Sequence, residues 1–291
     1  MKHAFLILAH NEPKILQTLI TLLDNKNHDI YVHVDKKNTL PNIQTTYSHI
    51  YFLTQRIDVR WGDISIIEAE LLLYKTANNN GPYLYYHLLS GVDLPLKSNI
   101  YIDDFFLKNK GKEFVGFSPL NEDFIWRVNR YHFFTKHYNV KGMKGFFFKS
   151  IRRITETLIN TIKRRHHNLY FKKGSNWSSI TQEFCDYIIL KENEILKTFR
   201  YTLAPDEFFL QTYLWNSPYK KNIFNLYDEN TSCMREIDWE RGTDTGHPYT
   251  WGQCSQDINI LINSKKIFAR KFSSKYMNII TELSTRLQQL Q

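Results

Sequence analysis

The stretch Tyr83-Leu84-Tyr85-Tyr86-His87-Leu88-Leu89-Ser90-Gly91-Val92-Asp93-Leu94-Pro95-Leu96 decides the fold of this chain. Its first half is a dense aromatic and aliphatic run, which is typical of a strand buried on both faces. The run breaks at Ser90-Gly91, passes Asp93 and stops at Pro95. A core strand that ends in such a loop brings a carboxylate to the carboxyl edge of a sheet, where open α/β sheets bind ligands. The alternative is that Asp93 only stabilises a turn.

Two more strands are predicted on the N-terminal side of this stretch. Residues 4–9 and 29–35 have strand patterns, and residues 13–23 between them have the apolar period of a helix. Strand, helix and strand at this spacing predict a right-handed βαβ unit with parallel strands. The unit lacks a GxGxxG motif, yet Asp35 at the end of its second strand is placed to contact a ribose or uracil. The sequence therefore predicts an α/β fold with a mainly parallel, Rossmann-like central sheet flanked by helices.

The remaining predicted elements follow in order along the chain. Strands are predicted at 51–53, 113–117, 177–180 and 237–239, and an ordered segment at 268–272. Helices are predicted at 64–77, 98–108, 143–167, 182–190, 204–212 and 256–262, and a solvated terminal helix from 275. Neither a repeat nor a low-complexity tract or linker separates them, so we expect one domain over residues 1–291.

The composition limits the class of protein. An apolar share of 42% in 291 residues supports a real core and excludes disorder. Three cysteines, Cys185, Cys233 and Cys254, form no CxxC pair, which favours a reducing, cytoplasmic location. The first apolar run, residues 4–9, is too short for a signal peptide or a spanning helix, and we interpret it as a strand. The aromatic share of 15% suits sugar or base stacking, although biased codon usage explains it as well.

The excess of positive charge is confined to one segment. Residues 136–173 contain eleven Lys or Arg and one acid, a local charge of +10 in a chain whose formal net charge is +9. Within residues 143–165 these cations flank an apolar stripe, which is made of Phe147, Ile151, Ile154, Leu158 and Ile162. This pattern is typical of an interfacial helix on anionic lipid, and the alternative is a core-packed helix with solvated charges. A non-catalytic nucleic-acid-binding protein is a second interpretation of the charge, but no recognised nucleic-acid motif is present.

Eight short motifs, in order along nearly the whole chain, resemble those of one family. They are Leu8-Ala9-His10-Asn11, His33-Val34-Asp35-Lys36-Lys37, Val59-Arg60-Trp61-Gly62 with Glu68-Ala69-Glu70-Leu71, Leu88-Leu89-Ser90-Gly91-Val92-Asp93-Leu94-Pro95, Gly174-Ser175-Asn176-Trp177, Pro205-Asp206-Glu207, Ile237-Asp238-Trp239 and Phe268-Ala269-Arg270-Lys271-Phe272. The set is similar to the core-2/I-branching glycosyltransferase family, which includes β-1,6-N-acetylglucosaminyltransferases, protein xylosyltransferases and many bacterial members. The resemblance implies a GT-A-type fold, a UDP-sugar donor and inversion at the anomeric carbon. It assigns residues 1–120 to nucleotide-sugar binding and residues 121–291 to acceptor binding and catalysis.

The resemblance implies a catalytic role for Glu207. Inversion requires an acceptor hydroxyl to attack opposite the leaving group while a carboxylate takes its proton. Glu207 matches the family's catalytic Glu in Pro205-Asp206-Glu207. Pro205 fits the first turn of the predicted helix, whose N-terminal dipole would favour an ionised Glu207. The alternative is that Asp206 and Glu207 are ordinary first-turn acids.

The diphosphate of the donor requires positive charge. Most GT-A enzymes hold a divalent metal through Asp-x-Asp, but this chain contains no Asp-x-Asp, so we expect no metal cofactor. Fixed cations must then neutralise the leaving UDP. The resemblance assigns this role to Lys271, and it places Tyr249 where the animal branching enzymes have an Arg. Arg241, in a Trp-x-Arg shared with xylosyltransferase-like members, is the expected substitute, with Arg270 as the second option.

The other site residues implied by the resemblance divide between donor and acceptor. The donor pocket is expected to contain His10, Asn11, Asp35, Trp61, Gly62 and Asp93. The acceptor is expected to meet Trp239, a stacking surface for a sugar face, with Trp177, Trp126, Arg127 and Arg130 as further candidates. The animal family's disulfides are not reproduced by the three cysteines.

The resemblance and these residues together imply an inverting, metal-independent glycosyltransferase. The resemblance makes UDP-GlcNAc, the family's commonest donor, the expected donor, with UDP-xylose or another UDP-hexose open, and the expected acceptor is a glycan or a lipid-linked oligosaccharide. A role in capsule, O-antigen or other cell-surface polysaccharide synthesis is expected, in the cytoplasm and peripherally at the inner face of the cell membrane through residues 143–165. A transferase-like scaffold without activity is a third interpretation, which is disfavoured because Glu207 and Lys271 are both present.

Overall fold

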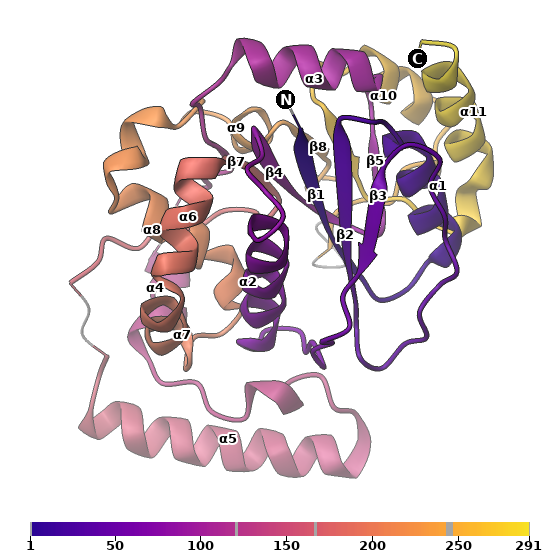
Figure 1. Cartoon of the computed structure of the whole chain (residues 1–291). Coiled ribbons are helices and arrows are strands. Elements are labelled where there is room, and N and C mark those ends of the chain that lie inside the picture. Colours follow the sequence, from indigo (N-terminus) through magenta and orange to yellow (C-terminus); the bar gives the residue numbers. More distant parts are fainter. Residues whose placement is uncertain (1, 120–121, 166–167, 243–246, 291) are drawn as a thin grey trace.

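The computed structural model describes residues 2–119, 122–165, 168–242 and 247–290. Within these residues the main sheet has six strands in the order β3-β2-β1-β4-β7-β6 (Figure 1). They are β1 (His3–Ala9), β2 (His28–Val34), β3 (His49–Phe52), β4 (Tyr85–Ser90), β6 (Phe114–Val115) and β7 (Ser178–Thr181). The strands β1 to β4 are parallel, whereas β7 runs antiparallel to β4 and β6. The prediction of an α/β fold with a mainly parallel central sheet is confirmed.

Helices cover both faces of the sheet because its central strands are apolar on both faces. Phe5 and Ile7 of β1 belong to the core that includes α1 (Pro13–Leu23). Leu6 and Leu8 belong to the opposite core, which includes α2 (Ser65–Asn78). Successive side chains of a strand point to opposite faces, so a strand between two helical layers needs an unbroken apolar run.

A second, smaller sheet joins the loop after β4 to the C-terminal half of the chain. Among the described residues it has three strands, in the order β5 (Asp93–Pro95), β9 (Phe268–Arg270) and β8 (Arg235–Ile237). The strand β5 pairs antiparallel with β9, which places Asp93 opposite Arg270. Asp93 closes the turn by accepting the N–H of Ser90 at 2.8 Å, and it also begins β5. The stretch that decides the fold therefore contributes to both sheets.

The remaining helices lie around the two sheets. They are α3 (Asn99–Lys108), α4 (Glu122–Asn129), α5 (Gly142–Ile162), α6 (Gln182–Leu190), α7 (Glu192–Phe199), α8 (Phe209–Trp215), α9 (Glu229–Cys233), α10 (Asp257–Asn263) and α11 (Met277–Gln288), with 3-10 turns η1 (Thr135–His137), η2 (Pro205–Glu207), η3 (Pro218–Asn222) and η5 (Ser274–Tyr276). Across the described ranges, none of the helices combines the length and the apolar character needed to cross a membrane.

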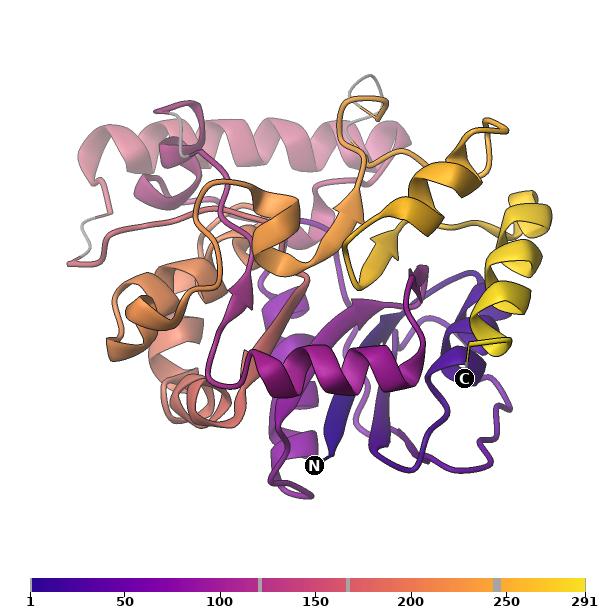
Figure 2. The same ribbon diagram turned by 90° about the horizontal axis from the view of Figure 1, so that it is seen from above.

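Two predicted helices differ in the structure. The segment 204–212 is not one helix, because Phe208, with φ −125° and ψ −37°, separates η2 from α8. Glu207 therefore ends a 3-10 turn and does not lie in the first turn of an α-helix. The prediction of a solvated terminal helix is also wrong, because Ile280 and Leu283 of α11 are buried in the core that contains α1 (Figure 2). The apolar face of α11, which includes Ile280 and Leu283, packs against this core.

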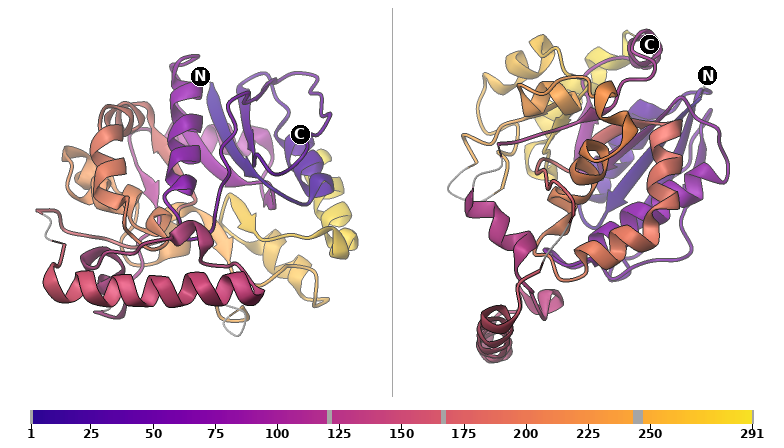
Figure 3. Two further views of the ribbon diagram at one scale, coloured as in Figure 1. Left: turned by 90° about the horizontal axis from the view of Figure 1, so that it is seen from below. Right: turned by 90° about the vertical axis from the view of Figure 1, so that its left-hand side faces the viewer.

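The helix α5 lies outside this body, beyond the edge of the main sheet at which β1, β2 and β3 end (Figure 1). Figure 3 shows it end-on as a separate layer. No residue of α5 is buried. The predicted helix over 143–167 is confirmed for most of its length, whereas the alternative of a core-packed helix is wrong.

Buried histidines lie near the start of the main sheet, at the edge opposite the loops predicted for the donor. His3 Nδ1 lies 2.9 Å from His87 Nε2, and His28 Nε2 lies 2.8 Å from Asp103 Oδ1. Burial, with a smaller contribution from His28, lowers the pKa of His3 to about 3. Burial also lowers the pKa of His87 well below its ordinary value. Both imidazoles are therefore neutral in the folded protein at pH 7.

Acid is expected to destabilise the fold through these two histidines. Below about pH 6.5 the unfolded chain binds protons that folded His3 and His87 exclude, so each lowers the free energy of unfolding by about 1.4 kcal/mol per pH unit. Glu113, whose pKa burial raises to about 7, acts in the opposite direction, so the effect is measured as a difference between variants. Urea unfolding of His87→Gln should show a slope of stability against pH, from about pH 6 to 4, that is less steep by about this amount. The variant His49→Gln, at an exposed site, should keep the wild-type slope, and equal slopes in all three proteins would contradict the account.

Candidate active site

The carboxyl edge of the parallel strands carries the first residues predicted for the donor. His10 and Asn11 follow β1 and are exposed, whereas Asp35 follows β2 and is buried. The N–H of Asp35 donates to the carbonyl of Ala9 at 2.8 Å, so the two loops adjoin. The atoms around the His10 ring exclude part of its hydration and so lower its pKa, and the nearby charge of Arg270 lowers it further. The first βα loop therefore lies near Arg270, the last residue of β9.

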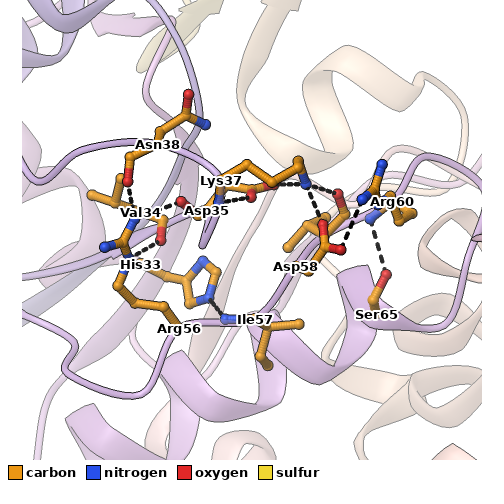
Figure 4. A network of polar contacts seen from close by, with 11 residues as sticks. His33, Val34, Asp35, Lys37, Asn38, Arg56, Ile57, Asp58, Arg60 and Ser65 are labelled. Atoms are coloured by element: carbon orange, nitrogen blue, oxygen red, sulfur yellow. Dashed lines mark hydrogen bonds and ion pairs between the residues drawn. The ribbon is translucent and has the colours of Figure 1, made fainter.

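Asp35 belongs to a polar network on the loops after β2 and β3 (Figure 4). Its carboxylate accepts from the backbone N–H of Lys37 at 2.9 Å and from the ammonium of Lys37 at 2.7 Å. The same ammonium lies 2.6 Å from Asp58 Oδ1. Arg56 donates to the carbonyls of Val34 and Asp35 at 2.9 and 2.7 Å. A nucleoside contact by Asp35 would use a carboxylate whose position Lys37 fixes.

The loop before α2 touches the segment that leads to Glu207. Gly62 has φ +76°, a conformation that residues with a Cβ rarely adopt, and a Cβ there would lie 3.2 Å from Leu203. The carbonyl of Gly62 accepts the N–H of Ala204 at 3.0 Å. Trp61 is exposed, and its ring lies 5.3 Å from that of Tyr138. The structure thus brings the predicted donor loop beside the predicted catalytic loop.

Asp93 forms a buried ion pair with Arg270. Arg270 Nη1 lies 2.8 Å from Asp93 Oδ1, and the guanidinium lies 4.2 Å from the centre of the Trp177 ring. Burial raises the pKa of Asp93, although Arg270 opposes the shift. Trp177, predicted as an acceptor contact, is half-buried beneath Arg270 and does not form an open stacking surface. The contact of Arg270 with Trp177 joins residues that are distant in the sequence, so no local pattern encodes it.

Arg241 and Lys271 differ in how their charges are matched. Arg241 Nε lies 2.5 Å from Asp238 Oδ2, Arg241 Nη1 lies 2.8 Å from Asp257 Oδ1, and the guanidinium lies 3.8 Å from the Tyr249 ring centre. Arg241 therefore places a guanidinium beside Tyr249, as expected for a substitute of the family's Arg. The carboxylates of Asp238 and Asp257 already bind this guanidinium. Among the ion pairs within the described residues, none includes Lys271. Burial lowers the pKa of Lys271, and the charge of Arg270 lowers it further.

Two cations hold Glu207 at the end of η2. Arg127 Nη1 lies 3.0 Å from Glu207 Oε2, and Lys173 Nζ lies 3.4 Å from the same oxygen. The other donors of Arg127 bind the carbonyls of Leu203 and Ala204 at 2.9 and 2.8 Å. Arg127, predicted as an acceptor contact, is therefore buried and positions the Glu207 loop. The side chain of Glu207 is 34% exposed, so its carboxylate is held but still reachable.

Two further carboxyl groups are electrostatically linked to Glu207, that of Asp206 directly and that of Glu70 through Asp206. Burial and the charge of Glu207 raise the pKa of Asp206 to about 7. Glu70 of α2 is fully buried, and its Oε1 accepts from Asn176 Nδ2 at 3.0 Å. Burial, with a contribution from Asp206, raises the pKa of Glu70 well above its ordinary value. Sequence reasoning assigned Glu70, Asn176 and Lys173 no role, although Glu70 and Asn176 lie within the quoted motifs.

The other predicted acceptor residues are spread over the surface. Trp239 follows β8 and is exposed, and Trp126 of α4 is exposed next to His132, with ring centres 5.1 Å apart. Arg130 follows α4 and is also exposed. The described contacts do not bring Arg130 to Glu207. These three residues thus form no common surface with Glu207 in the contacts described.

A groove of about 910 Å³ was missed by the sequence reasoning, and no predicted site residue lines it. It is lined by Ile125, Asn129, Leu169, Tyr170, Phe171, Lys172, Trp215, Asn216, Ser217 and Lys220. The ammonium groups of Lys172 and Lys220 lie 4.0 and 3.7 Å from the Trp215 ring centre. Lys172 precedes the Lys173 that holds Glu207, so the groove adjoins the Glu207 site along the chain.

No cluster suited to a metal ion is found in the part of the chain that the structure describes, when groups of three or more His, Cys, Asp or Glu side chains are considered. Asp93, the carboxylate nearest to such a role, uses its two oxygens for Ser90 and Arg270.

Comparison with known proteins identifies the family to which the chain belongs. The sequence model of the Core-2/I-Branching enzyme family matches residues 3–263. Xylosyltransferase 2 of Rattus norvegicus is 24% identical over 308 residues, which cover 96% of this chain and 33% of that protein. Xylosyltransferase 1 of Homo sapiens is 24% identical over 315 residues, which cover 93% of this chain and 29% of that protein. The chain thus spans about a third of the length of these curated relatives. Because the family match runs from the first strand to the end of α10, the chain belongs to the core-2/I-branching enzyme family.

Proposed function

We propose that this chain is an inverting glycosyltransferase that moves a sugar from a UDP-sugar to a hydroxyl of a glycan acceptor without a divalent metal. Membership of the core-2/I-branching enzyme family and the names of the xylosyltransferase relatives support the reaction class. The observation that carries the proposal is the Glu207 carboxylate, which Arg127 and Lys173 hold while it stays partly exposed. It lies beside the loop of Gly62, at the edge of the sheet where ligands of α/β folds bind.

In the proposed reaction Glu207 acts as the general base. It takes the proton of the acceptor hydroxyl while that oxygen bonds to the anomeric carbon of the donor sugar. The bond from the same carbon to the UDP oxygen breaks, and its electron pair leaves with UDP. Attack on the face opposite UDP inverts the configuration. Arg127 and Lys173 fix the position of the Glu207 carboxylate before the acceptor binds. Less conformational entropy of this side chain is therefore lost when the acceptor binds.

Lys271 is the cation that we propose for the UDP diphosphate. Arg241 and Arg270 are already matched by carboxylates, whereas Lys271 lies next to Arg270 and is destabilised as a cation by burial. A cation in such surroundings gains most from an anion that arrives with the substrate. The engagement of both Asp93 oxygens and the missing Asp-x-Asp support a reaction that uses these fixed charges in place of a metal.

GlcNAc is the sugar that we propose first, because it is the commonest donor sugar of the family that the motifs resemble. UDP-xylose is the alternative, and the xylosyltransferase relatives favour it. The acceptor that we propose is a glycan, or an oligosaccharide on a lipid carrier, of a capsule, O-antigen or other cell-surface polysaccharide.

Calorimetric titration with UDP tests the donor site. In buffer with EDTA, UDP is expected to bind the wild type, and Lys271→Gln should weaken binding about tenfold to a hundredfold, since a hydrogen bond to a charged group contributes about 1.5–3 kcal/mol. Lys275→Gln, four residues further on at an exposed position, should bind UDP like the wild type. Binding that requires added Mg²⁺ or Mn²⁺, or equal affinity of the wild type and Lys271→Gln, would oppose the proposed use of fixed charge.

A further inference from the structure

The helix α5 is attached to the protein through its polar side chains. The backbone N–H of Tyr131 donates to Asn160 Oδ1 at 2.7 Å, and Asn160 Nδ2 donates back to the carbonyl of Tyr131 at 3.1 Å. The guanidinium of Arg152 lies 4.2 Å from the centre of the Tyr138 ring. Both contacts reach the segment 131–138, so one face of α5 is fixed against that segment.

The opposite face of α5 presents apolar side chains to solvent. Side chains at helical spacing on this face have exposed fractions between 59% and 90%; they are Met143, Phe147, Ile154, Leu158 and Ile162. At about 100° per residue they form one stripe along the helix. A surface helix normally turns such a stripe toward the core, so the polarity of α5 is inverted with respect to the protein. Its 21 residues give a stripe about 30 Å long, and exposed apolar patches of this kind mark interaction surfaces.

The charges on α5 indicate what covers the stripe. Lys144, which follows Met143 of the stripe, and Arg153, which precedes Ile154 of the stripe, are exposed, whereas the one acid of the helix, Glu156, turns toward His132, with Oε1 3.4 Å from Nδ1. A second copy of this chain would bring cations against cations. An anionic bilayer matches both features, because the apolar side chains enter the boundary of the acyl chains while Lys and Arg meet the headgroups.

We propose that α5 is an interfacial docking helix that holds the protein on a bilayer containing anionic lipids. Since α5 lies beyond the carboxyl edge of the main sheet, docking turns that edge toward the bilayer. Arg152 stacks on Tyr138, and Tyr138 packs on Trp61 of the donor loop, so the docked helix is in contact with the candidate active site through two aromatic rings. Docking on the bilayer does not require catalysis. An experiment that shows no docking is therefore distinguishable from one that shows no glycosyl transfer.

Flotation with lipid vesicles tests the proposal. The wild type is expected to bind vesicles of phosphatidylcholine with 30% phosphatidylglycerol, and to bind vesicles of pure phosphatidylcholine at least tenfold more weakly, as expected when headgroup charge contributes. The double variant Lys144→Gln/Arg153→Gln should lose about 25-fold in affinity for the anionic vesicles, since each cation near the surface contributes about fivefold. The variant Phe147→Ser/Ile154→Ser/Leu158→Ser should lose at least about tenfold, because each removes apolar burial.

Matched variants control for charge and for exposed apolar area. Lys108→Gln/Lys110→Gln removes the same charge from the far side of the molecule, and Leu190→Ser removes an exposed apolar side chain of α6. Both should bind anionic vesicles like the wild type. Circular dichroism verifies that each variant retains its helix content. The proposal is overturned if the wild type does not bind anionic vesicles, if the control variants lose as much as the α5 variants, or if ultracentrifugation shows a dimer that the apolar α5 variant abolishes.

Discussion

Glu207→Gln is expected to lower the turnover number about 1,000-fold while UDP binds as before, since a general base contributes about 10²–10⁴-fold. The amide keeps the size of the side chain, and one oxygen remains to accept from Arg127, so the loop stays in place. It cannot take the proton of the acceptor hydroxyl. The lost rate is therefore a loss of chemistry, and it should appear in kcat more than in the KM for the donor.

An exposed carboxylate on the terminal helix provides the control for this variant. Glu282→Gln removes one side of the exposed pair between Glu282 and Arg286 on α11 and should leave the turnover number within about twofold of the wild type. Steady-state assays of UDP release, with donor saturating, measure both variants. A Glu207→Gln protein that keeps more than about a tenth of the wild-type rate would remove Glu207 from the role of base.

Arg235→Met is expected to destabilise the protein by about 3–5 kcal/mol, because it removes several hydrogen bonds of a buried charged group, each of which contributes about 1.5–3 kcal/mol. Arg235 begins β8 in the second sheet and is buried, and its guanidinium reaches the main sheet. It donates to the carbonyl of Ser178 at 2.7 Å and to Ser179 Oγ at 3.2 Å, both in β7. It also lies 4.6 Å from the centre of the Phe268 ring in β9. Methionine fills part of the volume but cannot replace the hydrogen bonds that the guanidinium donates.

Urea unfolding of Arg235→Met and Arg286→Met provides the comparison. Arg286→Met removes a cation from an exposed position of α11 and should change stability by less than about 0.5 kcal/mol. An Arg235→Met protein as stable as Arg286→Met would mean that the two sheets do not depend on the Arg235 guanidinium.

The central part of the fold could be predicted because its signals are local. The run of residues 83–89 and the apolar period of α1 each specify an element without knowledge of its neighbours. The terminal helix shows the limit of that reasoning, because its apolar face is visible in sequence but the surface that receives it is not. Phe208 shows another limit, since a single residue outside the helical region separated η2 from α8.

The candidate site could be predicted as a set of motifs but not as a set of contacts. The motifs contain Glu207 and Lys271, and they also contain Asp93 and Arg270, whose pairing depends on strand register between positions 177 residues apart. Arg127 was predicted as an acceptor contact, but in the structure it holds the Glu207 loop, because its other donors bind backbone carbonyls that only the folded loop presents. A local sequence pattern does not show which distant residues a side chain will contact.

The sequence alone also could not predict which face of α5 is directed toward the protein. The stripe and the cations of residues 143–165 were visible, but both a core-packed and an exposed helix have that pattern. The contact of Asn160 with Tyr131 decides between them, because it fixes the polar face inward.

Release of UDP from a panel of UDP-sugars, measured with EDTA present, tests the central claim most directly. UDP-GlcNAc, UDP-xylose, UDP-glucose and UDP-galactose are each supplied with and without a glycan acceptor, to the wild type and to Glu207→Gln. The account predicts that at least one donor releases UDP in EDTA, with water or the glycan as acceptor, and that this release falls about 1,000-fold in Glu207→Gln. Release that EDTA abolishes would mean that a metal replaces the fixed charges, and an absence of UDP release from every donor would contradict the proposed function.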